Sequence, residues 1–577
     1  MRRAPLLHLQ SDFPCNRSYR NPDRRPPLGE ETDYSRTVEK NVNPSTKQGL
    51  QGLSNAQIVA FGIFLSRIAG LIRESLLRST LALGPAADAF AAALRIPNLL
   101  QNLLGEGSLS ASFIPVYSKL LGEGRKEEAR KAAGATLGLL AAISGMLVLV
   151  GVLAARPIAA VLTPGFDNSR YELTVDLLRI TFIGIGALVL SAWCLGVLNS
   201  HRKFFLSYVA PVFWNITQIV VLVFVFTRSW NTFDAATAVA WGLVAGGILQ
   251  FSIQMVAVWK IAPDLRPTLN RSLPDVIEIR RRFLPAVAGR GVVQISAYVD
   301  LFLASLLSTG AVAALLSAQV LYLLPISLFV MSVAASELPE MSRAGHSSDL
   351  AQRSNNAMRK SLFFVLFTAV IYIGAGEQIV DALFGWGAFS SDDSLTVWVV
   401  LSAYSLGLPA VAASRILQTS CWSLGDTKGP AQIAGIRVLV ASLVGLSLMF
   451  PLDLLAFTEG GLTNQDIEGP HLGAVGLALG SAVASWVEML LLSRRAKRTL
   501  PELTSLKRLF FKIGVPASLA FLLTALLKFL LGSLPSLLIA PLIIGISGLF
   551  YTLIAFRSGV EESHLVLRPV RRILYRR

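Results

Sequence analysis

The first apolar segment of the sequence, residues 56–82, carries charged side chains at helical spacing. They are Arg67, Arg73, Glu74 and Arg78. On a helix, Arg67, Glu74 and Arg78 share one stripe, and Arg73 lies about 120° round from it. Glu74 can pair with one arginine at i+4 spacing, which leaves positive charge over. Guanidinium groups bind phosphate through bidentate, charge-assisted hydrogen bonds, so this excess indicates an anionic ligand such as a pyrophosphate.

The second apolar segment, residues 87–118, continues the polar pattern. Asp88, Arg95 and Glu106 are seven and eleven residues apart, and Asn98 and Asn102 lie between the last two. On an ideal helix the three charges line one face for about 27 Å, at about 1.5 Å per residue. A charge at mid-bilayer costs at least about 2.5–3.5 kcal/mol, so a stripe of this length predicts a water-filled cavity.

These charges have an alternative interpretation. They can pair with one another to fix helix packing, or extend along the helix to the membrane interface. Arg78 and Asp88, near the ends of their segments, fit the interfacial alternative as well as they fit a cavity.

A later pair of segments, residues 283–308 and 311–340, carries a weaker polar set. It consists of Arg290, Gln294, Tyr298, Asp300, Gln319 and Glu337. Arg290 and Gln294 are one turn apart and can face the same cavity, although Arg290 can equally reach the interface. Asp300 is a candidate proton or cation site, or the counter-charge to an arginine of the first segments. Further along, Glu488 is expected to pair with Arg494 or Arg495.

Composition places all these residues in a membrane protein. The 577 residues are 53% hydrophobic and 15% charged, whereas soluble domains carry about 25% charged residues. The apolar residues form blocks of about 20, the length that crosses roughly 30 Å of hydrocarbon. We predict an all-α polytopic membrane protein with about fourteen transmembrane helices. The predicted spans are 56–82, 87–118, 132–155, 173–199, 205–228, 235–260, 283–308, 311–340, 361–385, 395–423, 430–450, 471–493, 509–531 and 534–556.

The connections between spans alternate in charge. Those after even-numbered spans are basic, and the others are nearly free of Lys and Arg. By the positive-inside rule, both termini are expected in the cytoplasm. The net charge of +16 is thus a sign of topology rather than of nucleic-acid binding. Three widely spaced cysteines and five scattered histidines predict neither disulfides nor a metal site. We also expect no cofactor, and no phosphate-binding loop of the GxxxxGK[ST] type occurs in the sequence.

A repeat with an offset of about 225 residues divides the chain. The stretch from Leu94 to Pro97 resembles Leu321 to Pro325, and both lie at the same place in a six-span unit. Parallel repeats of this kind predict two lobes with a substrate path between them. The predicted organisation is a disordered cytosolic tail (1–52), an N-lobe of spans 1–6 (53–262), a basic cytosolic linker (263–282), a C-lobe of spans 7–12 (283–497), spans 13–14 (498–558) and a basic cytosolic tail (559–577).

The segment from Ser66 to Pro115 resembles the signature of the MurJ (MviN) lipid II flippases, in the MOP exporter superfamily. The matching elements are Ser66-Arg67-x-x-Gly70-x-x-Arg73-Glu74, Gly84-x-x-x-Asp88-Ala89-Phe90, Pro97-Asn98-Leu99-Leu100, Gly105-Glu106-Gly107-Ser108 and Phe113-Ile114-Pro115. The resemblance implies two six-helix lobes in pseudo-two-fold relation around a cationic cavity, and two C-terminal helices that form a groove for a lipid tail. It further implies that the protein moves lipid II, an undecaprenyl-pyrophosphate-linked disaccharide-pentapeptide, from the inner to the outer leaflet of the bacterial inner membrane by alternating access.

The expected activity is therefore transport rather than enzyme catalysis. The expected partners are lipid II, membrane lipids and cell-wall synthesis enzymes, without nucleic acid. Arg67, Arg73, Asp88 and Glu106 match polar residues that matter in the family. With the candidates found from the residues, the predicted substrate-binding set is Arg67, Arg73, Glu74, Asp88, Arg95, Asn98, Glu106, Arg290, Gln294, Asp300 and Gln319.

Two departures from the family pattern keep other functions open. The family often has another basic residue just after Pro-Asn-Leu-Leu, where this chain has Gln101 and Asn102. The family's eighth span commonly carries an arginine where this chain has Gln319-Val320; Arg290 is a hypothetical substitute. The alternatives are a related transporter of another polyprenyl-diphosphate-linked glycan, a cation-coupled drug antiporter of the same fold, and a non-transporting scaffold.

Overall fold

The computed structural model describes residues 45–343, 347–458, 461–463, 471–504 and 506–567. Within these ranges, the side chains of residues 45–61, 63, 106, 288–297, 456–458, 461–463 and 506–508 are outside the description. By its internal contacts the chain divides into Met1–Gln57 and Ile58–Arg577. Most of the predicted N-terminal tail lies outside the described residues, and the helical bundle is formed by the second unit.

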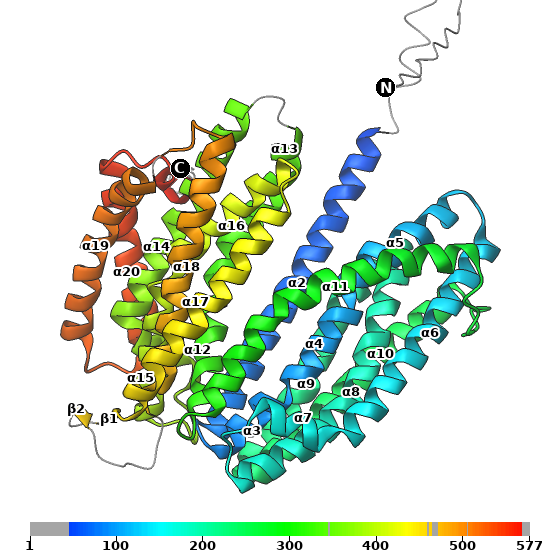
Figure 1. The fold of residues 1–577 in the computed structure, drawn as a ribbon, viewed down its shortest axis with the longest axis horizontal. Coiled ribbons are helices and arrows are strands. Elements are labelled where there is room, and N and C mark those ends of the chain that lie inside the picture. The colour runs from blue at the N-terminus through cyan, green and yellow to red at the C-terminus, as the bar shows by residue number, and fades with distance from the viewer. Residues whose placement is uncertain (1–44, 344–346, 459–460, 464–470, 505, 568–577) are drawn as a thin grey trace, which may run out of the picture. The chain divides into compact units, whose positions relative to one another are not determined.

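The N-terminal half of this unit is a bundle of helices. They are α2 (Ser45–Leu81), α3 (Pro85–Ala93), α4 (Arg95–Leu104), α5 (Glu106–Gly122), α6 (Lys126–Leu153), α7 (Ala155–Leu162), α8 (Asn168–Ser200), α9 (Phe204–Thr227) and α10 (Thr232–Ile261) (Figure 1). The central helix is α8, which packs against α3, α5, α6 and α10. Side-chain caps fix where helices begin: the Asp167 carboxylate accepts a hydrogen bond from the Arg170 backbone N–H at the start of α8.

The C-terminal half contains the remaining helices and one short hairpin. The helices are α11 (Pro274–Ser305), α12 (Ala311–Pro325), the π-helix η1 (Ile326–Met331), α13 (Ser332–Arg343), α14 (Ser347–Phe384), α15 (Ser391–Ser405), α16 (Leu408–Ser423), α17 (Lys428–Asp453), α18 (Gly473–Thr499), α19 (Leu506–Leu531) and α20 (Ser536–Arg557). Strands β1 (Ala456–Thr458) and β2 (Gly461–Thr463) pair antiparallel, with Phe457 opposite Leu462. The last two helices, α19 and α20, pack against α14, as an addition to the C-lobe.

The described helices account for the predicted membrane spans. Ten are long and apolar enough to cross a membrane, or eleven when α15 and α16, bent by 43° at their break, count as one span. The other three predicted spans coincide with α2, with the series α3–α4–α5 and with α11, which are the segments that carry the predicted charges. Large apolar side chains such as Met146, Leu153 and Phe529 are exposed on outer helix faces, as expected for contact with lipid.

Close helix packing in the C-lobe depends on glycine. A Cβ added at Gly476 of α18 would lie 2.6 Å from the backbone nitrogen of Met449 on α17, and one at Gly480 would lie 2.7 Å from the carbonyl oxygen of Ala441. The absent side chains let the two helix backbones approach closely, as small residues do at membrane helix interfaces.

Contacts between the lobes reproduce the sequence repeat. The Asp88 carboxylate accepts hydrogen bonds from the backbone N–H groups of Gly310 and Ala313, which are 222 and 225 residues away. The Arg95 guanidinium donates to Gln319, 224 residues away. Residues one repeat apart therefore meet across the interface, as they do when two equivalent helices face each other near a pseudo-two-fold axis. Both of the spans that meet here are broken helices. Predicted span 2 is broken at Leu94 and Gly105, and predicted span 8 is broken at the π-helix that follows Pro325.

Helix α11 departs from the predicted lobe boundaries. The sequence assigned it to the C-lobe, but it packs along α4 and α5 of the N-lobe and reaches α12, α17 and α18 of the C-lobe (Figure 1). It also begins at Pro274, inside the predicted linker, so the segment that joins the lobes is only residues 262–273. Proline suits this position because the first turn of a helix does not need its N–H.

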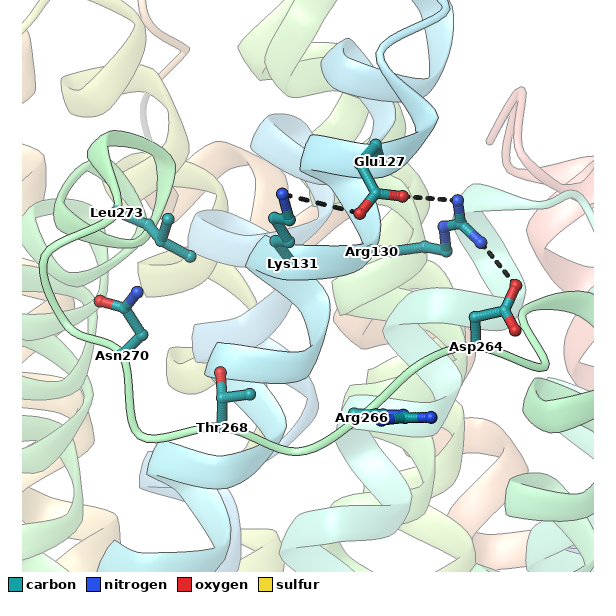
Figure 2. Close-up of a pocket in the computed structure, with 8 residues that line it drawn as sticks. All are labelled: Glu127, Arg130, Lys131, Asp264, Arg266, Thr268, Asn270 and Leu273. Atoms are coloured by element: carbon teal, nitrogen blue, oxygen red, sulfur yellow. Dashed lines mark hydrogen bonds and ion pairs between the residues drawn. The ribbon is translucent and has the colours of Figure 1, made fainter.

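The linker is bound to the N-lobe through its backbone. The Thr268 N–H donates to the Gly134 carbonyl oxygen of α6 at 3.1 Å, and a Cβ at Gly134 would lie 2.2 Å from the carbonyl oxygen of Arg266. Figure 2 shows the cavity of about 320 Å³ beside this contact. Most of its charged side chains pair with one another: Arg130 contacts Asp264 at 2.7 Å and Glu127 at 2.6 Å. The cavity is therefore part of the linker's attachment to α6.

Candidate functional site

The charged stripe of α2 is only partly neutralised. Glu74 accepts from the Nη2 atom of Arg78 at 2.6 Å and from the Nη2 atom of Arg73 at 3.2 Å, so it pairs with two arginines where one was predicted. Arg67 is exposed and has no ion-pair partner in the part of the chain that the structure describes. Three arginines thus face one glutamate on this helix.

Arg73 joins the stripe to the next wall of the N-lobe. Its guanidinium carbon lies 5.0 Å from the ring centroid of Trp214 on α9, a cation–π contact that holds the group in place. Its Nε–H is buried and has no hydrogen-bond partner among the described residues. Arg73 therefore has a hydrogen-bond donor available for a ligand.

Arg95 lies where the lobes meet. Its guanidinium donates to the Gln319 side chain at 3.5 Å, and Gln319 donates to the Tyr404 hydroxyl at 2.9 Å. The Tyr298 hydroxyl donates to the Arg95 carbonyl oxygen at 3.2 Å. Asp300 is close enough to interact with Arg95 electrostatically. The structure thus brings Arg95, Asp300 and Gln319, which were predicted from distant segments, into one polar cluster.

Asp88 lies in a different environment from either one predicted. Its carboxylate is fully buried and not exposed at the protein surface. It accepts from the N–H groups of Gly310 and Ala313 at 2.7 and 2.8 Å, and lies 3.5 Å from the Arg170 guanidinium. A carboxylate at a helix N-terminus is stabilised by the free N–H groups and the helix dipole. Asp88 therefore caps α12 and joins the lobes; we call these four residues the Asp88 latch.

The contacts around the latch extend to a surface carboxylate. Arg170 also bonds the Asp167 side chain at 2.7 Å. Partial burial raises the pKa of Asp167, but hydrogen bonds from the Arg170 N–H, the Ser169 hydroxyl and the Arg170 guanidinium outweigh it and lower the pKa to about 2. Asp167 is thus ionised at every physiological pH and holds Arg170 toward the latch.

A second, neutral cavity lies inside the N-lobe. It has a volume of about 510 Å³ and is lined by α2, α4, α5, α8, α9 and α10. Ser66, next to Arg67, forms part of its wall, and so does Trp214, on which Arg73 stacks. Gln101 and Asn102, the two amides that stand where the family often has a basic residue, also line it. The cavity therefore adjoins the arginines without sharing their charge.

A family model described as "Lipid II flippase MurJ" matches residues 77–551, most of the chain. The chain belongs to the MurJ family. Three relatives named "Probable lipid II flippase MurJ" agree with this. The protein of Rhizobium meliloti (strain 1021) is 29% identical over 524 residues, which are 88% of this chain and 94% of the relative. The Rhizobium tropici protein is 30% identical over 73% of this chain and 76% of its own length. The Bdellovibrio bacteriovorus protein is 32% identical over 72% and 79%, respectively.

Solved structures show the same fold. A lipid II flippase MurJ in an inward closed conformation superposes with a TM-score of 0.70 at 24% identity, over 87% of this chain and 99% of that one. An inward-facing multidrug resistance MATE transporter of the MOP superfamily gives a TM-score of 0.59 at 16% identity, over 76% and 95%. The MurJ membership of this chain and its all-helical, two-lobed fold are therefore as predicted.

Not every predicted MurJ site residue can be placed in full. The side chains of Glu106, Arg290 and Gln294 lie outside the described residues, so the hypothesis that Arg290 replaces the family's span 8 arginine stays a prediction. Asn98 is exposed on α4.

The C-lobe of this MurJ protein holds two arginines that the sequence reasoning missed. Arg415 on α16 donates to Gln418 at 3.1 Å, and Arg437 on α17 lies 3.4 Å from Glu488. Gln418 in turn donates to Glu488 at 2.8 Å. The signal was available, because both arginines lie inside predicted spans. The expected pairing of Glu488 with Arg494 or Arg495 is wrong, since Arg495 bonds Asp426 at 2.5 Å instead.

Proposed function

We propose that this protein flips lipid II from the inner to the outer leaflet of the bacterial inner membrane. The observation that carries the proposal is the surplus of guanidinium groups on α2. Its three arginines, Arg67, Arg73 and Arg78, are balanced by a single glutamate, Glu74. Arginine is the side chain best suited to a pyrophosphate, which is the charged centre of lipid II. Membership of the MurJ family supports the same substrate.

The contacts support distinct roles for the predicted site residues. Arg67, Arg73 and Arg95 bind the pyrophosphate, and Glu74 orients Arg73. Asn98, Glu106, Arg290, Gln294, Asp300 and Gln319 are proposed to line the rest of the path. The Asp88 latch acts differently, because it holds the lobes together at one end while the substrate enters from the other. The substrate leaves the path between the lobes when this latch opens. This is an alternating-access mechanism, and it requires no covalent step.

Charge in the loops supports the orientation of the molecule. Basic connections place both termini in the cytoplasm, so the latch faces the periplasm. We assign residues 53–262 and 283–497 to the two lobes, with α11 bridging them, and α19 and α20 to a groove for the lipid tail. An inside-negative membrane potential favours outward movement of an anionic headgroup. Cell-wall synthesis enzymes are the protein partners expected for such a substrate.

Purified variants test the arginine assignment. Arg67→Ala and Arg73→Ala should each weaken lipid II binding about 10- to 100-fold, since a hydrogen bond to a charged group contributes about 1.5–3 kcal/mol. Both should also fail to complement a flippase-depleted strain, and Arg67→Lys should retain part of the activity. Arg179→Ala is the matched control, because Arg179 is exposed on α8 and pairs only with Asp176 in the described part of the chain.

Other outcomes would favour the alternatives. A drug antiporter predicts that Asp300 and Glu106 are needed and that the arginines are dispensable. A scaffold predicts complementation by every variant. Binding and complementation at the wild-type level in both arginine variants would refute the flippase proposal.

A further inference from the structure

The cavity inside the N-lobe has the surface of a binding site. We call it the N-lobe chamber; its polar lining consists of Ser66, Gln101, Asn102, Ser110, Ser191, Trp214, Asn215 and Gln250. Its volume of about 510 Å³ lies within the range of small-ligand pockets, about 300–1,000 Å³. Hydroxyls, amides and an indole supply both hydrogen-bond donors and acceptors.

Several of these polar groups have no hydrogen-bond partner among the residues that the structure describes. The side chains of Ser66, Gln101 and Asn102 make no hydrogen bond with described residues. The Oδ1 atom of Asn215 and the Nε1 atom of Trp214 are buried and have no partner in the described part of the chain either. A buried polar group without a partner costs about 1–3 kcal/mol, so these two atoms of Asn215 and Trp214 favour an occupant that forms hydrogen bonds, and the more exposed side chains of Ser66, Gln101 and Asn102 are accessible to it.

One wall of the chamber is held in place by its own hydrogen bonds. Gln250 donates to the Ser191 hydroxyl at 2.7 Å, and Ser191 donates to Gln254 at 2.6 Å. Gln254 is fully buried and its Nε2 atom has no partner among the described residues. This chain of hydrogen bonds links α8 to α10 and fixes the geometry of the wall before any ligand arrives.

The chamber differs from the arginine site in charge. Its described lining contains no charged side chain, although Arg73 stacks on Trp214 at its edge. An unpaired charge is strongly disfavoured in such a site, whereas a neutral group that forms hydrogen bonds is not. A ligand with a charged centre and an adjoining neutral polar part would therefore place the charge on the arginines and the neutral part in the chamber.

We propose that the N-lobe chamber binds the uncharged, N-acetylated sugars of lipid II while the arginines bind its pyrophosphate. This rests on the proposed function and adds a specificity site to it. Sugar hydroxyls and acetamido groups match the unpaired amides and hydroxyls of the wall. The pentapeptide ends in a carboxylate and is disfavoured there by its charge. A site that bonds a ligand's hydroxyl and N–H groups strongly rejects an analogue that lacks them.

Three lipids separate the contributions of pyrophosphate, sugar and peptide. The full-length protein in nanodiscs is titrated with lipid II, with a peptide-free disaccharide lipid whose lactyl carboxyl is capped as a neutral methylamide, and with undecaprenyl pyrophosphate. The variants are Gln101→Leu and Asn102→Leu, which remove the hydrogen-bonding groups and keep similar bulk. Gln432→Leu is the control, because Gln432 is an exposed amide on α17 that takes no part in the lining.

The proposal predicts a selective loss. Each chamber variant should weaken binding of lipid II and of the peptide-free lipid about 3- to 10-fold, as for one lost hydrogen bond, and leave undecaprenyl pyrophosphate binding unchanged. Loss with lipid II alone would assign the chamber to the peptide and overturn the proposal. Unchanged binding of all three lipids would show that the chamber holds only water and would overturn the proposal. An equal loss of binding with all three lipids would overturn it too. The flippase proposal fails separately, when the Arg67 and Arg73 variants bind all three lipids normally.

Discussion

The Asp88 latch offers the sharpest test of how the lobes move. Replacing Asp88 with asparagine keeps the size of the side chain and removes its charge. An asparagine amide presents one acceptor oxygen and an NH₂ group, whereas two backbone N–H groups, of Gly310 and Ala313, approach the carboxylate at 2.7 and 2.8 Å. One of them must then face the NH₂ group and lose its bond, and Arg170 loses its buried counter-charge.

The size of the effect follows from these contacts. A hydrogen bond to a charged group contributes about 1.5–3 kcal/mol, so losing one and weakening the other lowers the stability of the latched state by about 2–4 kcal/mol. Each 1.4 kcal/mol is about a tenfold change in an equilibrium constant. If the unlatched state occupies about 1% of the wild-type protein, within the usual range of minor states, a loss of 2 kcal/mol raises it to about a quarter.

Distances between spin labels across the latched end measure this population. Asn168, on the N-lobe, and Ser391, on the C-lobe, are exposed and suit cysteine labelling after Cys15 is replaced, because Cys194 and Cys421 are buried. The Asp88→Asn protein should show an added population at longer distance. Asp176→Asn is the matched control, since Asp176 pairs with Arg179 on its own helix.

An Asp88→Asn protein that keeps its thermal stability and a wild-type distance distribution would show that the latch does not hold the lobes together. Loss of stability without a longer-distance population would make Asp88 a residue of the N-lobe core instead.

Two further predictions concern the edges of the fold. Gly134→Ala should displace the linker and lower stability by about 1–3 kcal/mol, because its Cβ would lie 2.2 Å from the carbonyl oxygen of Arg266. The control is Gly145→Ala on the same helix, which should not lower stability because its Cβ meets nothing within 4 Å. Equal Tm values for the two variants would contradict this prediction. Asp167→Ala should lower the Tm through loss of the α8 cap, about 1 kcal/mol. Because the pKa of Asp167 is lowered to about 2, its contribution is lost only as the pH falls through the acid range toward 2, so the Tm difference should stay constant from pH 8 to pH 5; a difference that shrinks within that range would count against the assignment.

Much of the fold could be read from the sequence because membrane helices have a strong signal. Blocks of about 20 apolar residues and alternating loop charge determine spans and topology, and each predicted span coincides with a helix or a broken series of helices. The arginine surplus on α2 was also predictable, since charges within an apolar block are rare and the helical period places them on a shared face. The pairing of Glu74 with two arginines depends on side-chain conformations that the period does not specify.

Other features depend on contacts between distant segments. The environment of Asp88 is determined by the N-terminus of α12, more than 200 residues away, which no local pattern reveals. The placement of α11 across both lobes is similar, because its apolar block predicts a membrane span but not the helices on which that span packs. Arg415 and Arg437 were missed for another reason: each is a single charge in a long apolar span, without the clustering that made Arg67 and Arg73 conspicuous.

Two of the hydrogen-bonded contacts between the lobes differ greatly in strength, and the difference bears on transport. Asp88 accepts two short bonds in a fully buried site, whereas Arg95 makes one bond of 3.5 Å to Gln319. Since a ligand shifts an equilibrium only by binding one state better than the other, a substrate must gain contacts in the open state that offset the cost of breaking the latch. Asp88 cannot supply them, because its carboxylate is fully buried and already accepts bonds from Gly310 and Ala313. Arg95 can supply such contacts. Losing its long hydrogen bond to Gln319 costs little, and a new hydrogen bond to a pyrophosphate oxygen is charge-assisted. Substrate binding can therefore act on the Asp88 latch through the weaker contact between Arg95 and Gln319.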